Sequence, residues 1–340
     1  MLNKLINKEN LTYEEAYNLY NILKDESEIK ISGYLCALQT KGYTSEEIAG
    51  FAKAMRDNAL KVNLGNEICD TCGTGGDGSS TINVSTAVSI LLSCFKKVAK
   101  HGNVSITSNS GSANVLDELG IKKDCTPEQC KEMIHKTNYV FLFAPNYHYS
   151  LKKIMPVRRE LKIKTIFNIL GPLANPANPD YQLIGVYSSD LVEKVGKALK
   201  LIGVKKGLVI YGNGLDELNP NEESIIYEIN SNNNNKNDNN DNNENNLYTI
   251  HPKDLGITPS KPIPCSSATE SAKRIINVFN GKINEDRDFI LLNSAGALYS
   301  ANIVNDFKDG YELAKQTIDE GKVVEKLKDI QKYSEILNKK

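Results

Sequence analysis

The sequence has no tryptophan and no apolar run of the roughly 18 residues that a membrane-spanning helix requires. It also lacks a signal-peptide core at its start and an excess of charge of either sign. Its 41 Lys and Arg side chains balance 42 Asp and Glu side chains, which leaves a formal net charge of −1. We therefore expect a cytoplasmic chain that binds neither membrane nor nucleic acid and attracts any anionic ligand through local groups.

Cysteine is scarce, and its pattern excludes a disulfide framework. The seven cysteines are an odd number scattered along a long chain. Cys69 and Cys72 form one C-x-x-C pair, but the sequence has no second such pair and no pair of histidines near it. We expect reduced thiols, and neither a zinc site nor a redox site.

Glycine, in contrast, is concentrated in one place. Residues 73–78 read GTGGDG, directly after a short strand-like run at 67–69. Glycine permits a backbone turn with positive φ and lets an anion approach the peptide N–H groups. The spacing matches neither a P-loop nor a dinucleotide-binding fingerprint. A flexible surface loop is the plain alternative, but the residues that follow favour a phosphate site.

Two further strand-to-helix junctions follow the glycine-rich loop. Residues 83–86 (NVST) open an apolar helix, a strand at 98–103 ends in a basic corner, and polar residues at 108–114 precede a helix at 115–119. A helix start presents unpaired N–H groups, which bind anions well when small polar side chains lie beside them. Together the three junctions predict a ligand that carries several phosphates.

The pattern of the whole chain predicts an α/β fold with two domains. The first part contains only short amphipathic helices, two of which begin in capping boxes at Thr12 and Thr44. Strands and helices then alternate, which is typical of a mostly parallel central sheet flanked by helices. We expect a small all-helical domain at 1–65, with a contribution from about 165–178, and a large α/β domain at 66–340.

An asparagine-rich insert interrupts the second domain. Residues 231–246 contain no apolar side chain, so we expect a disordered surface loop. The runs on either side of it predict the two strands of a hairpin. We expect strands at 139–143, 181–186, 207–211, 224–229 and 247–250, a helix at 167–176 broken by its Gly-Pro pair, and C-terminal helices at 267–280, 286–300 and 310–320.

Asp216 and Glu217 are adjacent carboxylates after an expected strand. Such carboxylates repel each other unless a cation or a positive dipole offsets the repulsion. Without the phosphate motifs the pair indicates only a solvated turn. Beside those motifs it predicts a magnesium site, with the Ser85 hydroxyl as a third ligand, because magnesium prefers hard oxygen ligands and bridges phosphates.

Three cationic or titratable side chains stand near the expected active-site loops. His148 follows the break after the strand at 139–143, where a lone histidine is more often structural than functional. Arg158 and Arg159 follow Pro156, and a guanidinium suits a carboxylate, although a solvated surface charge is the alternative.

These motifs, in this order, resemble the anthranilate phosphoribosyltransferase family of tryptophan biosynthesis, which has a nucleoside phosphorylase-like fold. The resemblance spans nearly the whole chain. It implies transfer of the phosphoribosyl group of 5-phosphoribosyl 1-pyrophosphate (PRPP) to the amine of anthranilate. The matching motifs are GTGGDG at 73–78, NVST at 83–86, KHGN at 100–103, SGSA at 110–113, FAPNYH at 143–148, PVRREL at 156–161, TIFNILGPLANP at 165–176 and GLDE at 214–217.

The resemblance also implies site residues, a homodimer formed through the helical domain, and magnesium, with two ions per active site. No residue is evident as an essential general base, which fits an amine that needs no deprotonation before attack. For the metal we expect Ser85, Asp216 and Glu217. For anthranilate we expect Gly73, Asn103, His148, Arg158, Gly171 and Pro172. For PRPP we expect Gly73, Gly76, Asp77, Thr81, Asn83, Val84, Ser85, Thr86, Lys100, His101, Gly102, Asn103, Ser105, Ser108 and Ser112.

The sequence departs from the family pattern at two positions. Val104 stands where the family often has arginine, and Asn109 stands where it often has lysine. Both departures remove positive charge near the expected phosphates. The affinity for PRPP is then either weaker or maintained by neighbouring lysines.

Three other functions fit parts of the pattern. A pyrimidine nucleoside phosphorylase needs phosphate as nucleophile and a base pocket, against which Asn103, His148 and Arg158 argue. A non-catalytic relative that binds nucleic acid needs a basic surface, which the nearly neutral composition disfavours. A purely structural helical protein leaves the three polar junctions unexplained.

Overall fold

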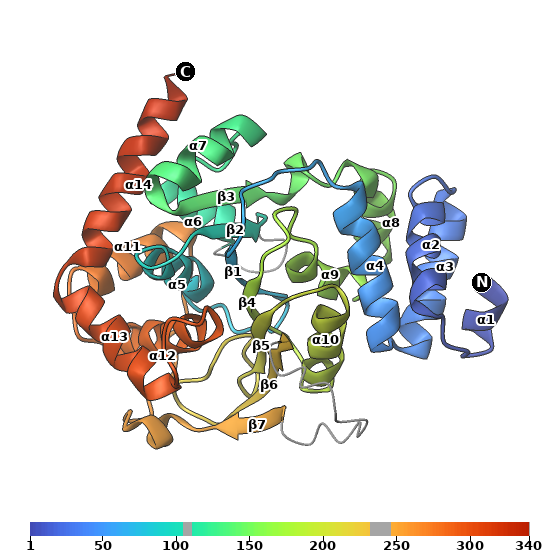
Figure 1. Cartoon of the computed structure of the whole chain (residues 1–340). Coiled ribbons are helices and arrows are strands. Elements are labelled where there is room, and N and C mark those ends of the chain that lie inside the picture. Colours follow the sequence, from blue (N-terminus) through green and yellow to red (C-terminus); the bar gives the residue numbers. More distant parts are fainter. Residues whose placement is uncertain (105–110, 232–245, 340) are drawn as a thin grey trace.

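The computed structural model of the chain describes residues 1–104, 111–231 and 246–339. A seven-stranded sheet with the order β3-β2-β1-β4-β5-β6-β7 runs through its centre (Figure 1). The first five strands in this order are parallel, β6 pairs antiparallel with β5, and β7 pairs antiparallel with β6. The strands are β1 (Cys69–Gly73), β2 (Val98–Gly102), β3 (Tyr139–Phe143), β4 (Tyr181–Gly185), β5 (Lys206–Tyr211), β6 (Ser224–Asn230) and β7 (Leu247–Ile250).

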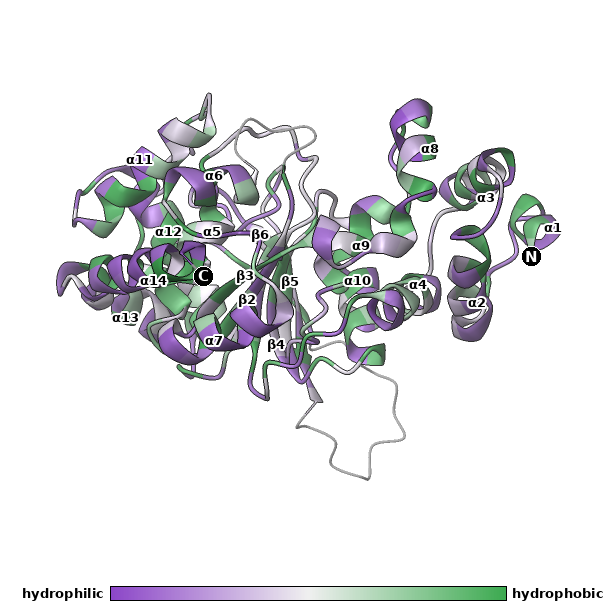
Figure 2. Ribbon diagram, turned by 90° about the horizontal axis from the view of Figure 1, so that it is seen from above, coloured by the Kyte–Doolittle hydropathy of each residue, from purple (hydrophilic) through white to green (hydrophobic). Residues whose placement is uncertain are grey.

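Helices cover both faces of the sheet, as the view from above shows (Figure 2). α5 and α12 pack on one face, and α9 and α10 pack on the other. The helices are α1 (Leu2–Ile6), α2 (Tyr13–Leu23), α3 (Glu28–Lys41), α4 (Ser45–Asn58), α5 (Val84–Leu92), α6 (Ser112–Glu118), α7 (Pro127–Thr137), α8 (Ile154–Leu161), α9 (Phe167–Leu173), α10 (Asp190–Leu201), α11 (Ala268–Phe279), α12 (Glu285–Ser300), α13 (Phe307–Asp319) and α14 (Lys322–Asn338).

The central strands supply side chains to two separate apolar cores. Leu183 and Leu208 belong to the core that contains α5 and α12. Their neighbours Ile184 and Val209 belong to the core that contains α4, α9 and α10. Successive side chains of a strand point to opposite faces, so strands between two helical layers need apolar residues at every position. This explains why Leu183 and Ile184 of β4, and Leu208, Val209 and Ile210 of β5, are consecutive apolar residues.

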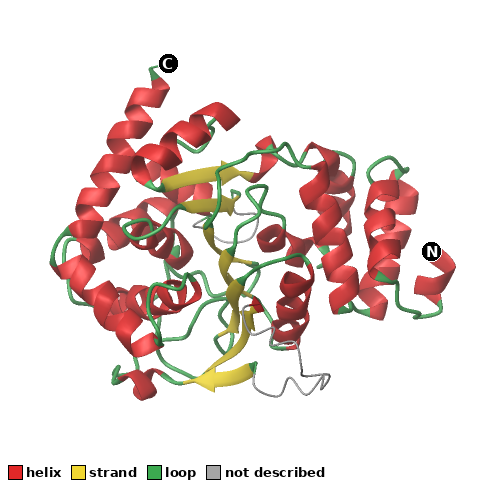
Figure 3. Ribbon diagram, viewed as in Figure 1, coloured by secondary structure: helices red, strands yellow, loops and turns green. Residues whose placement is uncertain are grey.

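The N-terminal helices lie to one side of the sheet (Figure 3). α1 to α4 share a core with α8 and α9, and that core continues onto α10. The capping boxes expected at Thr12 and Thr44 are present, each with a glutamate at the third helical position. The expected fold, a helical domain beside a mostly parallel α/β domain, is confirmed. The domain boundary at residue 66 stays a prediction.

Several element boundaries differ from those expected. The strand expected at 67–69 begins at Cys69 and runs to Gly73. The sequence pattern did not predict its polar residues as part of a buried strand, because their hydrogen-bond partners come from distant segments. α6 begins at Ser112, earlier than expected. α9 continues through Pro172, which lies in the last turn and costs one backbone hydrogen bond.

One helix was not expected, and one expected loop cannot be assessed. α14 begins after Gly321, which supplies no capping side chain, so the sequence gives no start signal for it. The hairpin of β6 and β7 is confirmed, but the insert that joins them lies outside the described residues except for its two ends. Within the described ranges, no helix combines the length and the apolar character that a membrane crossing needs.

Candidate active site

The loops after four parallel strands meet at one edge of the sheet. The chain passes from β1 to β2 on one side, whereas β4 pairs with β1 on the other side, so the strand order reverses at β1. In open α/β sheets a ligand crevice forms at such a reversal, beyond the carboxyl ends of the strands. Gly73 and Gly185 end the two strands that flank this point, and the loop after β5 brings Asp216 against both.

Both of these glycines make room for Asp216. A Cβ on Gly73 would collide with the Asp216 carboxylate, and a Cβ on Gly185 would collide with the Asp216 backbone. The N–H of Gly75 donates to Asp216 Oδ2 at 2.6 Å. Gly75, Gly76 and Gly78 have φ values of 64°, 76° and 79°, which residues other than glycine rarely adopt. The loop therefore turns back toward the carboxylates.

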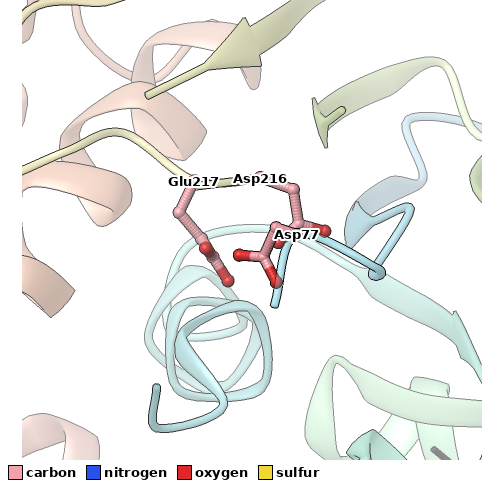
Figure 4. Close-up of side chains that lie close together, drawn as sticks. All are labelled: Asp77, Asp216 and Glu217. Atoms are coloured by element: carbon pink, nitrogen blue, oxygen red, sulfur yellow. The ribbon is translucent and has the colours of Figure 1, made fainter. Parts of the chain in front are cut away.

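Three carboxylates come together at this point. Asp77, Asp216 and Glu217 each offer an oxygen atom, and the three oxygens lie within 4.8 Å of one another. Figure 4 shows Asp216 and Glu217 on one loop and Asp77 approaching from the glycine-rich loop. Asp77 Oδ2 and Glu217 Oε2 are buried and have no hydrogen-bond partner among the residues that the structure describes.

The carboxylates disfavour one another's ionisation. Burial and then the nearby Asp77 charge raise the pKa of Asp216 to about 6. Burial and then the Asp216 charge raise the pKa of Glu217 well above its ordinary value. Buried carboxylates with unpaired oxygens carry a cost that a bound cation removes.

Lys100 lies beside this cluster in a fully buried position of β2. Its Nζ donates to the carbonyl of Thr71 at 2.6 Å and to Ser85 Oγ at 3.0 Å. Burial lowers the pKa of Lys100, while the charges of Asp70, Glu217 and other acidic groups raise it. The ammonium therefore stands at the start of α5, where helix N–H groups and a positive charge reinforce each other.

Asn83 caps α5 and connects it to α6. Its Oδ1 accepts from the N–H of Thr86 at 3.0 Å and from Ser85 Oγ at 3.3 Å, and its Nδ2 donates to Ser112 Oγ at 3.3 Å. A cavity of about 20 Å³, room for one water-sized group, lies between this helix start and the carboxylates. Its lining includes Gly73, Val84, Ser85, Asp216 and Glu217.

The C-terminal end of α9 is held from three directions. The carbonyl of Gly171 contacts His101 Nδ1 at 3.1 Å, that of Pro172 accepts from Gln182 Nε2 at 3.2 Å, and that of Leu173 accepts from Arg56 Nε at 2.6 Å. These donors come from β2, β4 and α4. Helix carbonyls at this end have no partner within the helix, so the three side chains fix its position.

His101 and His148 form a buried pair against this helix end. Their Nε2 atoms are 3.2 Å apart. A carbonyl only accepts, so Nδ1 of His101 carries a proton, and in the neutral ring its Nε2 accepts from Nε2–H of His148. Burial lowers the pKa of His101 well below its ordinary value and that of His148 to about 4, so both rings are neutral.

Arg158 lies on α8 at the end of the same region. Its Nη2 donates to Asn168 Oδ1 at 3.3 Å, and the guanidinium lies 5.5 Å from the ring centre of Phe167. Burial lowers the pKa of Arg158. No carboxylate of the described residues forms an ion pair with it, so the guanidinium keeps its capacity for an anion.

Comparison with known proteins identifies the family. Residues 65–324 match the a/b domain of a glycosyl transferase family, and residues 1–59 match its helical bundle domain. Anthranilate phosphoribosyltransferase of Methanococcus aeolicus is 72% identical over 335 residues, which cover 98% of this chain and 100% of that protein. The chain belongs to the anthranilate phosphoribosyltransferase family.

Solved structures of anthranilate phosphoribosyltransferases agree. The enzyme of Thermus thermophilus superimposes with a TM-score of 0.89 at 30% identity, over 98% of this chain and 99% of that chain. The enzyme of Saccharomyces cerevisiae in complex with PRPP and Mg superimposes with a TM-score of 0.85 at 25% identity, over 98% of this chain and 96% of that chain. The resemblance inferred from the motifs is therefore confirmed.

Most residues expected for the anthranilate phosphoribosyltransferase site gather at the edge of the sheet described above. Asn103 directly follows β2, its carbonyl accepts from the N–H of Ala113 at 3.2 Å, and Val104 follows as an exposed side chain. Thr81 is buried before α5. Ser105 and Ser108, together with the unusual Asn109, lie outside the described residues.

Some contacts at the anthranilate phosphoribosyltransferase site were not expected. Asp77, expected to contact PRPP, lies beside Asp216 and Glu217, where the three carboxylates could hold a metal ion. Lys164 donates to the carbonyl of Gly76 at 3.1 Å and lies 3.5 Å from the ring centre of Tyr187. The buried Asp70 carboxylate accepts hydrogen bonds from the backbone N–H of His101 and from Asn175 Nδ2. Each joins segments far apart in the chain, which residue patterns within one segment do not reveal.

Proposed function

We propose that the chain transfers the phosphoribosyl group of PRPP to the amine of anthranilate at this edge of the sheet. The products are N-(5-phosphoribosyl)anthranilate and pyrophosphate. The observation that carries the proposal is the convergence of Asp77, Asp216 and Glu217 beside the Lys100 ammonium and the start of α5. A cation site next to an anion site suits a substrate that binds as a metal pyrophosphate.

The carboxylates fit magnesium. Asp77 Oδ2 and Glu217 Oε2 are buried and find no hydrogen-bond partner within the described part of the chain, and burial together with neighbouring charges raises the pKa values of Asp216 and Glu217. Hard oxygen atoms of this kind are the ligands that magnesium prefers, and the Ser85 hydroxyl lines the same cavity. We propose two ions per active site. When bound, magnesium neutralises charge on the pyrophosphate and favours its departure.

The phosphates of PRPP are assigned to backbone and hydroxyl donors. The glycine-rich loop at 73–78 offers N–H groups, and Asn83, Ser85 and Thr86 stand at the first turn of α5. Lys100 adds a buried amine whose charged form, already desolvated, interacts with a phosphate more strongly than a surface lysine does. The remaining contacts expected from the sequence stay predictions, except that we assign His101, expected for PRPP, to the acceptor side, because its ring contacts the Gly171 carbonyl and His148.

Anthranilate is assigned to the end of α9. Gly171 and Pro172 lie there beside the pair of neutral histidines, and a neutral buried ring suits an aromatic substrate better than an imidazolium does. Arg158 supplies the group that suits a carboxylate. Asn103 directly follows β2 (Val98–Gly102), two residues after His101.

The chain's residues act by positioning and electrostatics. The amine of anthranilate has a lone pair and needs no deprotonation before it attacks C1 of the ribose; the nitrogen loses its proton after the C1–N bond has formed and pyrophosphate has left, so no general base is required for the attack. Positive charge grows on the ribose as the bond to pyrophosphate lengthens, and the fixed donors around the pyrophosphate stabilise its developing negative charge. A homodimer formed through the helical domain and a cytoplasmic location stay predictions.

The experiment that tests the function mixes the protein with anthranilate, PRPP and magnesium and follows the loss of anthranilate fluorescence. We expect turnover that stops when magnesium is chelated and resumes when it is returned. Arg158→Ala should raise the KM for anthranilate by about tenfold or more and leave the KM for PRPP nearly unchanged, because one charge-assisted contact is lost. No turnover by the wild type contradicts the function, and an equal rise in both KM values contradicts the role of Arg158.

A further inference from the structure

Asp70 is a buried carboxylate for which the mechanism above gives no role. It lies in β1 and is 1% exposed. Its Oδ1 accepts from the backbone N–H of His101 at 3.2 Å, and its Oδ2 accepts from Asn175 Nδ2 at 2.8 Å. One oxygen therefore holds strand β2, and the other holds the segment that follows α9.

Asn175 extends this connection. It is fully buried, its Nδ2 also donates to the carbonyl of Ala99 at 2.8 Å, and its Oδ1 accepts from the N–H of Ala177 at 2.9 Å. Both polar atoms of the Asn175 side chain therefore help to fix the chain just after α9. Because α9 ends at Leu173, the position of its last carbonyls depends on this anchor.

Two buried cations lie near Asp70 on opposite faces of the strands. The charges of Arg56, from α4, and of Lys100 both interact favourably with it. The backbone N–H of His101 donates to Asp70, whereas the Lys100 side chain reaches Thr71 and the start of α5. Successive side chains of a strand alternate between faces, so the contacts of Asp70 belong to the α9 side of the sheet and those of Lys100 to the α5 side.

We propose that Asp70 is a positioning residue for the acceptor side of the active site. Through the N–H of His101 and the amide of Asn175, it holds the His101–His148 pair in register with the end of α9. It acts through these groups and does not itself touch a substrate. The inference rests on the proposed function, because the acceptor at the end of α9 is taken to be anthranilate.

Asp70→Asn tests this role with almost no change in volume. Both carboxylate oxygens accept hydrogen bonds, so an amide in either orientation turns its NH₂ group toward another donor, either Asn175 Nδ2 or the N–H of His101. We expect the KM for anthranilate to rise about tenfold or more and the KM for PRPP to change by less than about twofold, because a charge-assisted contact is replaced by a repulsive one.

Two further variants separate positioning from a loss of stability. Asn175→Ala leaves the Asp70–His101 contact in place, and we expect it to raise the KM for anthranilate in the same selective way. This variant also carries the test if Asp70→Asn does not fold. Asp286→Asn is the matched control, since Asp286 is a buried carboxylate held by Arg274 at 2.5 and 2.8 Å on α12. We expect it to lower thermal stability without a selective effect on anthranilate.

A spectroscopic measurement reads the histidines directly. The chain has four histidines, so selective ¹⁵N labelling resolves their rings. We expect Asp70→Asn to shift the ring signals of His101 and His148 and to leave those of His135 and His251 unchanged. Unmoved signals for His101 and His148, an unchanged KM for anthranilate, or an equal rise in both KM values overturns the inference. Absence of anthranilate turnover in the wild type instead overturns the proposed function, because the ring signals report on Asp70 without substrate.

Discussion

Single residues of the site could be predicted where the chemistry lies within one segment. Asp216 and Glu217 are adjacent, and Ser85 lies in a helix start, so their residue types indicated the chemistry directly. The partners of these groups could not be predicted in the same way. Asp77 meets Asp216 only because β1 and β5 end at the same edge of the sheet, and His101 meets His148 only because β2 and β3, after which His148 follows, are neighbouring parallel strands that end at the same edge.

Asp216→Asn should stabilise the metal-free protein at neutral pH. Burial raises the pKa of Asp216 from 3.8 to about 6, so the folded state holds the proton more tightly than the unfolded state. Stability therefore falls as pH rises from about 4 to about 6 and stays lower above that window. In EDTA at pH 7.5 we expect the variant to have a higher Tm and a free energy of unfolding that is larger by up to about 3 kcal/mol. At pH 4.5 we expect both gains to be much smaller.

Magnesium provides the second half of this test. Adding it should raise the Tm of the wild type and have little effect on Asp216→Asn, because ligand binding stabilises only the state that binds. Asp286→Asn, a buried carboxylate paired with Arg274, should lower the Tm at both pH values. A lower Tm for Asp216→Asn in EDTA at pH 7.5 contradicts the assignment.

Lys100→Met should weaken PRPP binding selectively. The substitution keeps an apolar side chain of similar length and removes the ammonium that donates to Thr71 and Ser85. We expect the KM for PRPP to rise by about 10- to 100-fold, the range for loss of a charged hydrogen bond. Lys206→Met is the matched control, since Lys206 is a buried lysine of β5 that donates to Asn302. A comparable loss of PRPP affinity in this control contradicts a specific role for Lys100.

Elements with a local start signal were predicted well, and those without one were missed. Thr12 and Thr44 each cap a helix as expected, because the capping side chain and its partner lie three residues apart. α14 has no such signal. β1 was expected to be too short because Asp70 and Thr71 are polar, and only their tertiary partners make them suitable for a buried strand.

Two capping boxes of the helical domain differ in burial and allow a matched test at this scale. Glu47 of α4 is fully buried, accepts from the N–H groups of Leu11 and Thr44, and pairs with Lys41 at 2.8 Å. Removing its charge leaves the buried Lys41 unpaired, so we expect Glu47→Gln to destabilise the protein by about 3 kcal/mol. Glu15→Gln changes the exposed equivalent on α2 and should have little effect. Similar shifts of Tm in both variants contradict this account.

At the scale of the whole molecule, α9 joins the two parts of the chain. Its apolar side chains belong to the core of the N-terminal helices, while its last carbonyls are held by β2, β4 and α4. The sequence indicated that this segment contributes to the helical part, because its apolar run is interrupted by Gly-Pro. It could not indicate which three side chains fix the end of the helix, since they come from segments 117, 70 and 10 residues away.

Exposed apolar side chains of the helical domain predict where two copies of the chain associate. Ile29 on α3 is 84% exposed, and Ile6 on the adjacent α1 is exposed as well. Exposed apolar side chains on neighbouring helices favour an interface, since burial of each contributes about 1.5 to 3 kcal/mol. We expect a dimer by sedimentation velocity at micromolar concentration and a shift toward monomer for Ile29→Glu. Ile283→Glu changes an equally exposed isoleucine between α11 and α12 and should leave the mass unchanged. A monomeric wild type, or an equal shift in both variants, contradicts an interface at this position.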